Sequence, residues 1–310
     1  MIIILTSKFS KSCFQKSKPN YHIIMKVAVI GANGQLGSDI CKVYKEKGNT
    51  VHALNHNKLD ITNRNSCMEM IKGINPELLI NTAAMHKVEL CEQFPVKAFK
   101  VNGLGARNLA VISDELSIPL VHFSTDYVFD GGKQLPYVES DITLPINIYG
   151  NTKLSGEMFI RNIAKRYFIV RVSGLYGQSP CRGKGGLNFV KLMLKLAEEK
   201  KEIRVVDDEI LSPTYTFDIA QQLVELTRTE KYGLYHMVSQ GSCTWFEFAA
   251  QIFNLTKTNI KLNVARSGEF PTKVPRPKYS VLDNLNLANH GLDIMPDWST
   301  SLQNYLNDYY

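Results

Sequence analysis

The fold of this chain is decided by one stretch, Lys26-Val27-Ala28-Val29-Ile30-Gly31-Ala32-Asn33-Gly34-Gln35-Leu36-Gly37. The β-branched run 27–30 predicts a buried strand, which breaks directly into the three glycines, and residues 38–47 predict a helix. Glycines let the backbone approach a pyrophosphate, and the first N–H groups of the following helix can receive its negative charge. A turn that only tightens the corner would need one or two of these glycines. The stretch therefore predicts a nucleotide-binding turn between a strand and a helix.

Further strands and helices are expected to alternate along the first half of the chain. Strands are predicted at 50–54, 77–81, 119–124 and 167–172, and helices are predicted up to residue 72, at 96–116 and at 147–163. This order predicts an α/β fold of the Rossmann type, with a doubly wound parallel sheet. From residue 187 a helix, short extended pieces and aromatic loops predict a smaller C-terminal α/β lobe that creates the substrate cleft. We expect one unit over 25–310, with the cofactor domain mainly at 25–175 and the substrate lobe mainly at 176–310.

The composition is that of a globular protein. The 310 residues are 44% hydrophobic and 21% charged, and no apolar run approaches the roughly 20 residues that a membrane span needs. Four lysines in the first 24 residues, where no acid occurs, account for much of the net charge of +7; without them it would be +3. The six cysteines are scattered without a C-x-x-C pair. We therefore expect a cytoplasmic protein with no nucleic-acid or membrane partner and no dedicated metal site.

Residues 1–24 precede the organising stretch and differ from it in composition. They carry lysines and serines but no acid, as targeting peptides do, yet they contain no arginine and no clear cleavage site. Met25 stands immediately before the first predicted strand. We expect a disordered or dispensable extension, and a targeting peptide remains the alternative.

Two clusters of reactive side chains follow in chain order. Ser124-Thr125-Asp126-Tyr127 ends a predicted strand, where hydroxyl groups face the crevice of an open parallel sheet. Tyr149 and Lys153 are four residues apart in a predicted helix and share one face. A lysine cation within about 4–6 Å favours a tyrosinate and lowers the pKa of the phenol. The pair therefore predicts acid–base chemistry beside the nucleotide.

The loop after the second predicted strand bears on the choice of cofactor. An acidic residue at this place would bind the ribose hydroxyls and repel a 2′-phosphate, but the loop reads Asn55-His56-Asn57-Lys58. His56 and Lys58 could tolerate that phosphate, or they could be solvated loop residues. NADPH is therefore slightly favoured, and NADH remains open.

In this order the motifs resemble the dTDP-4-dehydrorhamnose reductase family, part of the extended short-chain dehydrogenase/reductase superfamily that modifies sugar nucleotides. The resemblance covers essentially all of residues 25–310. The matching pieces are the glycine turn 31–37, L-D-I-T at 59–62, N-T-A-A at 81–84, S-T-D-Y-V-F at 124–129, residues 149–153, S-P-T-Y at 212–215 and R-P at 276–277.

The resemblance implies an NAD(P)H-dependent reductase of the C4 ketone of dTDP-4-dehydro-6-deoxy-L-mannose (dTDP-4-dehydrorhamnose), which forms dTDP-L-rhamnose for cell-surface polysaccharide. It implies that Thr125 and Tyr149 bind the ketone oxygen, Tyr149 donates the proton, Asp126 touches the substrate and Lys153 anchors the cofactor ribose and tunes Tyr149. Tyr149 is also implied to contact the cofactor. The remaining cofactor residues that it implies are Gly31, Gly34, Gln35, Leu36 and Gly37 at the pyrophosphate, Asp60 and Ile61 at the adenine end, Ala84, Met85 and His86 at the middle, and Phe123 at a strand end. A Mg²⁺ ion that bridges phosphates or subunits, and a homodimer, stay open.

The chain departs from the family at three places, and two other functions stay open. Gly174 stands where family members place a tryptophan against the sugar, Leu211 replaces a glycine, and Met85-His86 replaces a His-Thr pair. Because an aromatic platform is missing, the exact sugar is not fixed. The alternatives are a nucleotide-sugar epimerase, dehydratase or decarboxylase that keeps its NAD bound, and a non-catalytic binding subunit like the regulatory subunit of methionine adenosyltransferase.

Overall fold

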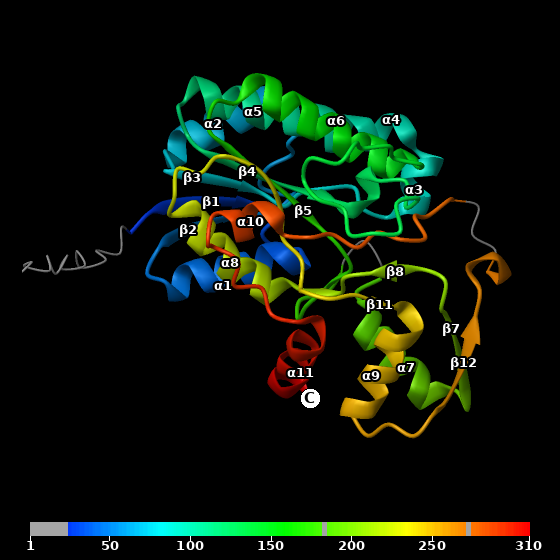
Figure 1. Ribbon diagram of the computed structural model, residues 1–310. Coiled ribbons are helices and arrows are strands. Elements are labelled where there is room, and N and C mark those ends of the chain that lie inside the picture. Colours follow the sequence, from blue (N-terminus) through cyan, green and yellow to red (C-terminus); the bar gives the residue numbers. More distant parts are fainter. Residues whose placement is uncertain (1–23, 182–184, 271–273) are drawn as a thin grey trace, which may run out of the picture.

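The computed structural model describes residues 24–181, 185–270 and 274–310 (Figure 1). The expected extension over residues 1–24 lies outside the described residues, apart from Ile24.

The centre of the molecule is a six-stranded parallel sheet in the order β10-β5-β4-β3-β1-β2. Its strands are β1 (Lys26–Ile30), β2 (Thr50–Leu54), β3 (Leu78–Asn81), β4 (Leu120–Thr125), β5 (Tyr167–Val172) and β10 (Gly233–His236). The chain runs outward from β1 in both directions, so the strand order reverses between β1 and β3. In open parallel sheets ligands bind outside the carboxyl ends of the strands at this reversal. The predicted doubly wound Rossmann-type fold is confirmed.

Helices cover both faces of the sheet (Figure 1). Along β1, Val27 and Val29 pack in one core with α1 and α8, while Ala28 and Ile30 pack in a second core with α2, α5 and α6. Both faces are therefore apolar, which explains why β1 is an unbroken hydrophobic run. The helices of these layers are α1 (Gln35–Glu46), α2 (Arg64–Ile74), α5 (Ala106–Glu115), α6 (Ile148–Ile163), α8 (Thr216–Thr227) and α10 (Leu285–Asn289).

A smaller lobe with its own core follows the sheet. Buried aromatic rings at its centre, Tyr176, Phe248 and Tyr305, lie with their centroids 5.3–5.4 Å apart around Tyr176. Its elements are β6 (Leu175–Tyr176), α7 (Phe189–Glu199), β7 (Glu202–Val206), β8 (Ile210–Leu211), β9 (Thr214–Tyr215), β11 (Cys243–Thr244), α9 (Trp245–Leu255), β12 (Lys261–Ala265), η4 (Ser267–Glu269) and α11 (Trp298–Tyr309). Because α8 and β10 belong to the large layers, the lobe is not one continuous block of sequence. The expected division at residue 175 therefore leaves α8 and β10 of the large layers on the C-terminal side of the boundary.

The long helix predicted at 96–116 is helical throughout but changes type in the middle. It consists of α4 (Pro95–Ala98), a π-helical turn η1 (Phe99–Gly105) and α5. Asn102 in that turn donates to Thr152 of α6 and bonds both the N–H and the carbonyl of Met85. The wider turn thus places one amide between α6 and the loop after β3. Two short elements flank the same region, α3 (Val88–Gln93) and the 3-10 turn η2 (Asp126–Val128).

The helices of the described residues are also short for a bilayer. Within 24–181, 185–270 and 274–310, none is long and apolar enough to cross a membrane.

Candidate active site

The glycine turn is closely packed against the neighbouring strand end. Gly31 has a φ of +79°, and a Cβ added there would lie 2.6 Å from Oγ1 of Thr82 and 2.8 Å from the backbone nitrogen of Ala83. A Cβ at Gly37 would collide with the carbonyl oxygen of Gly31. Gly34 is the N-cap of α1, and no side chain caps that helix end. The first N–H groups of α1 therefore face the cavity, which fits a pyrophosphate.

Substituting Gly31 by alanine is expected to lower the free energy of unfolding by about 2 kcal/mol and to weaken NADPH binding, since the new methyl meets backbone in a strained conformation. Gly48→Ala is the matched control. Gly48 has a similar φ of +84° but nothing within 4 Å of an added Cβ. It should lose only about 1 kcal/mol and bind NADPH normally. Denaturant unfolding and fluorescence titration check both, and equal NADPH affinity in the two variants would contradict the prediction.

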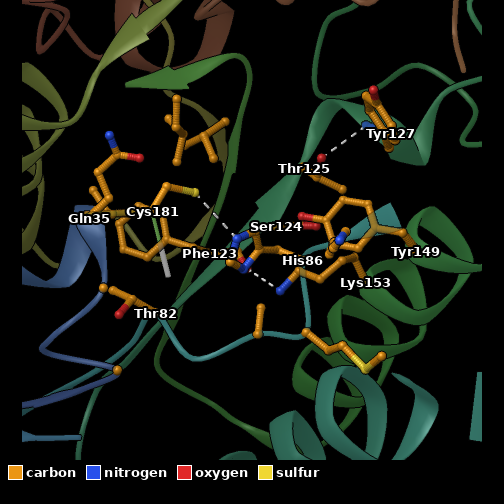
Figure 2. A pocket seen from close by; sticks show the side chains of 18 of the residues that line it. Gln35, Thr82, His86, Phe123, Ser124, Thr125, Tyr127, Tyr149, Lys153 and Cys181 are labelled. Atoms are coloured by element: carbon orange, nitrogen blue, oxygen red, sulfur yellow. Dashed lines mark hydrogen bonds between the residues drawn. The ribbon is translucent and has the colours of Figure 1, made fainter. Parts of the chain in front are cut away.

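The turn opens into a cavity of about 690 Å³. Every site residue predicted from the sequence lies on its wall: Gly31, Gly34, Gln35, Leu36, Gly37, Asp60, Ile61, Ala84, Met85, His86, Phe123, Thr125, Asp126, Tyr149 and Lys153. Figure 2 shows Thr125, Tyr149 and Lys153 gathered on one side, Gln35 on the other, and Phe123 and Ser124 between them. The structure brings the candidates together, while their individual roles stay predictions.

Thr125 and Asp126 lie at the carboxyl end of β4 and are buried. The Thr125 hydroxyl donates to Oδ1 of Asp126 at 2.9 Å and caps η2 by accepting from the N–H of Tyr127 at 3.2 Å. The Ser173 hydroxyl donates to Oδ2 of Asp126 at 2.8 Å. Burial raises the pKa of Asp126, and hydrogen bonds from Ser280, Ser173 and Thr125 oppose that shift. Asp126 is thus an acceptor held by hydroxyl groups.

Tyr149 and Lys153 stand one turn apart on α6, as the spacing predicts. Asn147 caps this helix by accepting from the N–H of Gly150 at 2.8 Å. Nζ of Lys153 donates to the carbonyl oxygen of Phe123 at 2.5 Å and lies 3.2 Å from Nε2 of His122. Burial lowers the pKa of Lys153 to about 8.

The electrostatics of the tyrosine differ from the sequence-based expectation. Burial raises the pKa of Tyr149, a hydrogen bond with Thr125 opposes the shift, and the charge of Asp126 adds to it. The spacing predicts that Lys153 lowers this pKa, but Lys153 is itself buried, and its ammonium group donates to the carbonyl oxygen of Phe123. In this structure Tyr149 is therefore a phenol that keeps its proton.

The cavity wall also contains residues to which the sequence assigned no individual role. Ser124 is buried, and its hydroxyl has no partner among the described residues. Glu209 and Trp245 enter from the smaller lobe, where burial raises the pKa of Glu209 and a hydrogen bond from Trp245 opposes it. Cys181 approaches His86 at 3.7 Å. Only Ser124 had a signal, its place at a strand end; the others reach the cavity through contacts distant in sequence.

Two departures from the family pattern touch each other in space. Gly174 has a φ of +56°, and a Cβ there would lie 2.8 Å from Cδ1 of Leu211 and 3.0 Å from Cα of Pro213. Leu211 is buried and lines the cavity with Gly174. The leucine side chain therefore occupies the space beside the glycine, and the wall there is aliphatic.

Neither Asp60 nor any other acidic residue in the described part of the chain belongs to a cluster that could bind a metal ion. Asp60 accepts from the N–H of Thr62 at 2.9 Å, which lowers the pKa of its carboxyl group. Over the described residues, no group of three or more His, Cys, Asp or Glu side chains could hold a metal ion.

Comparisons with known proteins cover both the sheet and the smaller lobe. The family model described as RmlD substrate binding domain matches residues 25–310. The spore coat polysaccharide biosynthesis protein SpsK of Bacillus subtilis (strain 168) is 39% identical over 284 residues, which cover 91% of this chain and 97% of that protein. A dTDP-4-keto-6-deoxy-D-glucose reductase of Streptomyces niveus is 37% identical over 88% of this chain and 94% of its own length. The crystal structure of a dTDP-4-dehydrorhamnose reductase from Bacillus anthracis (strain Ames) in complex with NADP has a TM-score of 0.88 at 38% identity, and the match covers 92% of this chain and 100% of that one.

Proposed function

The chain belongs to the RmlD substrate binding domain family, and from this premise we propose that it reduces the C4 ketone of dTDP-4-dehydrorhamnose to give dTDP-L-rhamnose, with NADPH or NADH as the reductant. The reductases of Streptomyces niveus and Bacillus anthracis support a dTDP-linked 4-keto-6-deoxy sugar as the substrate class. The NADP in the latter structure supports the slight preference for NADPH.

The observation that carries the proposal is the convergence of two distant motifs on one cavity. The glycine turn after β1 and the Thr125, Tyr149 and Lys153 group from β4 and α6 line the same space of about 690 Å³. That space can enclose a nicotinamide and a sugar ring together.

The chain's own residues meet the needs of a ketone that becomes an alcohol. Negative charge develops on the carbonyl oxygen as hydride arrives, so a proton donor must lie beside it. Tyr149 fits this role, because a pKa raised by burial keeps the phenol protonated. Thr125 forms a hydrogen bond with the hydroxyl group of Tyr149. Asp126 accepts the proton of the Thr125 hydroxyl in a hydrogen bond and thereby fixes its direction.

The residues of the glycine turn fit a dinucleotide on steric grounds. The packing of Gly31 and Gly37 leaves backbone, not side chains, beside the N-terminus of α1. Gly34, Gln35 and Leu36 would hold the pyrophosphate, Asp60 and Ile61 the adenine end, and Ala84, Met85 and His86 the middle; Lys153 would hold the nicotinamide ribose beside Phe123. When bound, the reduced nicotinamide supplies the hydride.

The test uses the purified full chain with NADPH and then with NADH. The substrate is dTDP-4-dehydro-L-rhamnose, with dTDP-4-keto-6-deoxy-D-glucose as a second sugar because Leu211 and Gly174 reshape the wall. We expect the absorbance of the reduced cofactor to fall and dTDP-L-rhamnose to form. Loss of cofactor absorbance only with the second sugar would move the proposal to that sugar. No consumption by folded protein that carries tightly bound NAD would replace it with an epimerase or dehydratase.

A further inference from the structure

His122 is a buried residue that the proposed reaction does not use, yet it contacts Lys153 directly. It lies in β4, one position before Phe123, and it is 1% exposed. Nε2 of its ring is 3.2 Å from Nζ of Lys153, and Nδ1 is 3.0 Å from Nδ2 of Asn81. A Cβ at Gly156 would lie 3.4 Å from Nε2 of His122, so the glycine lets α6 approach the ring.

Asn81 determines which ring nitrogen carries the proton. Asn81 ends β3 directly beside His122 in the sheet, and its Oδ1 accepts from the backbone N–H of Ala83 at 3.0 Å. Because a backbone N–H can only donate, this bond places the amide oxygen at Ala83 and the amide NH₂ at His122. The NH₂ donates to Nδ1, so Nδ1 must be the acceptor. A neutral ring that accepts at Nδ1 carries its proton on Nε2.

That proton points at Lys153. An ammonium group has only donors, so it cannot hydrogen-bond a ring N–H, whereas a neutral amine can accept from it. The Lys153 cation still has the carbonyl oxygen of Phe123 as an acceptor. We propose that Asn81 locks His122 in the Nε2–H tautomer and that His122 thereby favours the neutral form of Lys153, which makes both of them positioning residues for the proposed reductase.

The surroundings agree with a neutral ring and a lysine of variable charge. Burial and the nearby charge of Lys153 hold the pKa of His122 well below its usual value. Burial lowers the pKa of Lys153 to about 8, and Glu157 on the same helix opposes that shift. Glu157 is already paired with Arg171 of β5 at 2.7 Å, and Tyr149, on the adjacent turn of α6, keeps its proton. The Nε2–H tautomer of His122 and the burial of Lys153 therefore both lower the pKa of the lysine.

The consequence is a lysine that titrates near physiological pH. Because burial already lowers the pKa of Lys153 to about 8, we expect the side chain to lose its charge as the pH rises above that value. Since a lysine that binds the cofactor ribose must keep its donors and charge, NADPH affinity and turnover should both fall as the pH rises through that value. This consequence rests on the proposed function, whereas the tautomer does not.

The test is Asn81→Asp. The aspartate keeps an oxygen for the N–H of Ala83 but presents an acceptor to Nδ1, which moves the ring proton to Nδ1 and turns a lone pair toward the lysine. In ¹⁵N-histidine-labelled full chain, nitrogen–proton correlation spectra should show His122 with its proton on Nε2 in the native protein and on Nδ1 in the variant. The alkaline fall in NADPH affinity should move up by about one pH unit, a tenfold change in the Lys153 protonation equilibrium.

Two variants separate the tautomer from added charge and from misfolding. Asn81→Leu removes the donor without a charge and should move the alkaline fall upward as well. Asn63→Asp adds the same charge at the N-cap of α2, where the side chain likewise accepts from a backbone N–H, that of Ser66, and should move nothing. A native protein with its proton on Nδ1, or an unchanged alkaline fall in both Asn81 variants, would overturn the inference. The expected tautomer in a protein that reduces no sugar would refute only the proposed function.

Discussion

Tyr149→Phe is expected to lower kcat by about 10²- to 10⁴-fold, the range that a positioned general acid contributes. The phenylalanine keeps the ring but removes the phenol proton that the proposed reaction delivers to the carbonyl oxygen beside Thr125. NADPH affinity should change much less than kcat, since the glycine turn and Lys153 are untouched and only the hydroxyl group of Tyr149 is lost. The measurement is the rate of NADPH oxidation with dTDP-4-dehydro-L-rhamnose, together with a fluorescence titration of NADPH.

Tyr127→Phe is the matched control for that loss. Tyr127 lines the same cavity, and its ring meets that of Tyr149 edge to face with the centroids 5.9 Å apart. It loses the same hydroxyl group from a neighbouring ring, so its kcat should fall by no more than about threefold, a cost of less than one kcal/mol. Equal losses in the two variants would show that the proton comes from elsewhere.

The sheet could be predicted from the sequence because its signals are local. Strands β1 to β5 are apolar runs that end in glycine, asparagine or hydroxyl residues, and the observed bounds lie within one residue of those predicted. Strand β10 has only four residues, Gly-Leu-Tyr-His, and its pairing partner β5 ends at Val172, far earlier in the chain. Nothing local distinguishes such a strand from a loop, which is why the sheet's sixth strand was missed.

The position of the site could be predicted from the strand ends, but the protonation states of its side chains could not. Parallel strands bring their carboxyl ends to one edge, so residues that end β1, β3 and β4 must converge. The charge state of Lys153 depends on Asn81 and His122, which are neighbours only across the sheet. Spacing along α6 places Tyr149 next to Lys153 but carries no information on what buries them.

Arg171→Met is expected to lower the free energy of unfolding by about 3–5 kcal/mol, because it leaves a buried carboxylate without its partner. Arg171 is 2% exposed, and its Nε and Nη2 donate to the two oxygens of Glu157 at 3.0 and 2.7 Å. Its Nη1 lies 3.5 Å from Nε2 of His236 in β10, whose Nδ1 contacts two carbonyl oxygens. The guanidinium thus joins β5 to α6 and to the edge strand. Denaturant unfolding of the full chain measures the loss.

The controls separate an unpaired charge from a lost contact. Arg171→Met combined with Glu157→Met removes both charges, so no ion is left buried. The double variant should therefore lose much less free energy of unfolding than the two single variants lose in sum. Arg64→Met breaks the Arg64–Glu115 pair, whose side chains are 47% and 46% exposed, and should cost less than about 1 kcal/mol. A double variant as unstable as that sum would mean that the geometry of the bidentate pair, and not the desolvation of a lone carboxylate, holds α6 against β5. In that case the position of Tyr149 and Lys153 would depend on Arg171, and NADPH affinity would fall in the double variant as well.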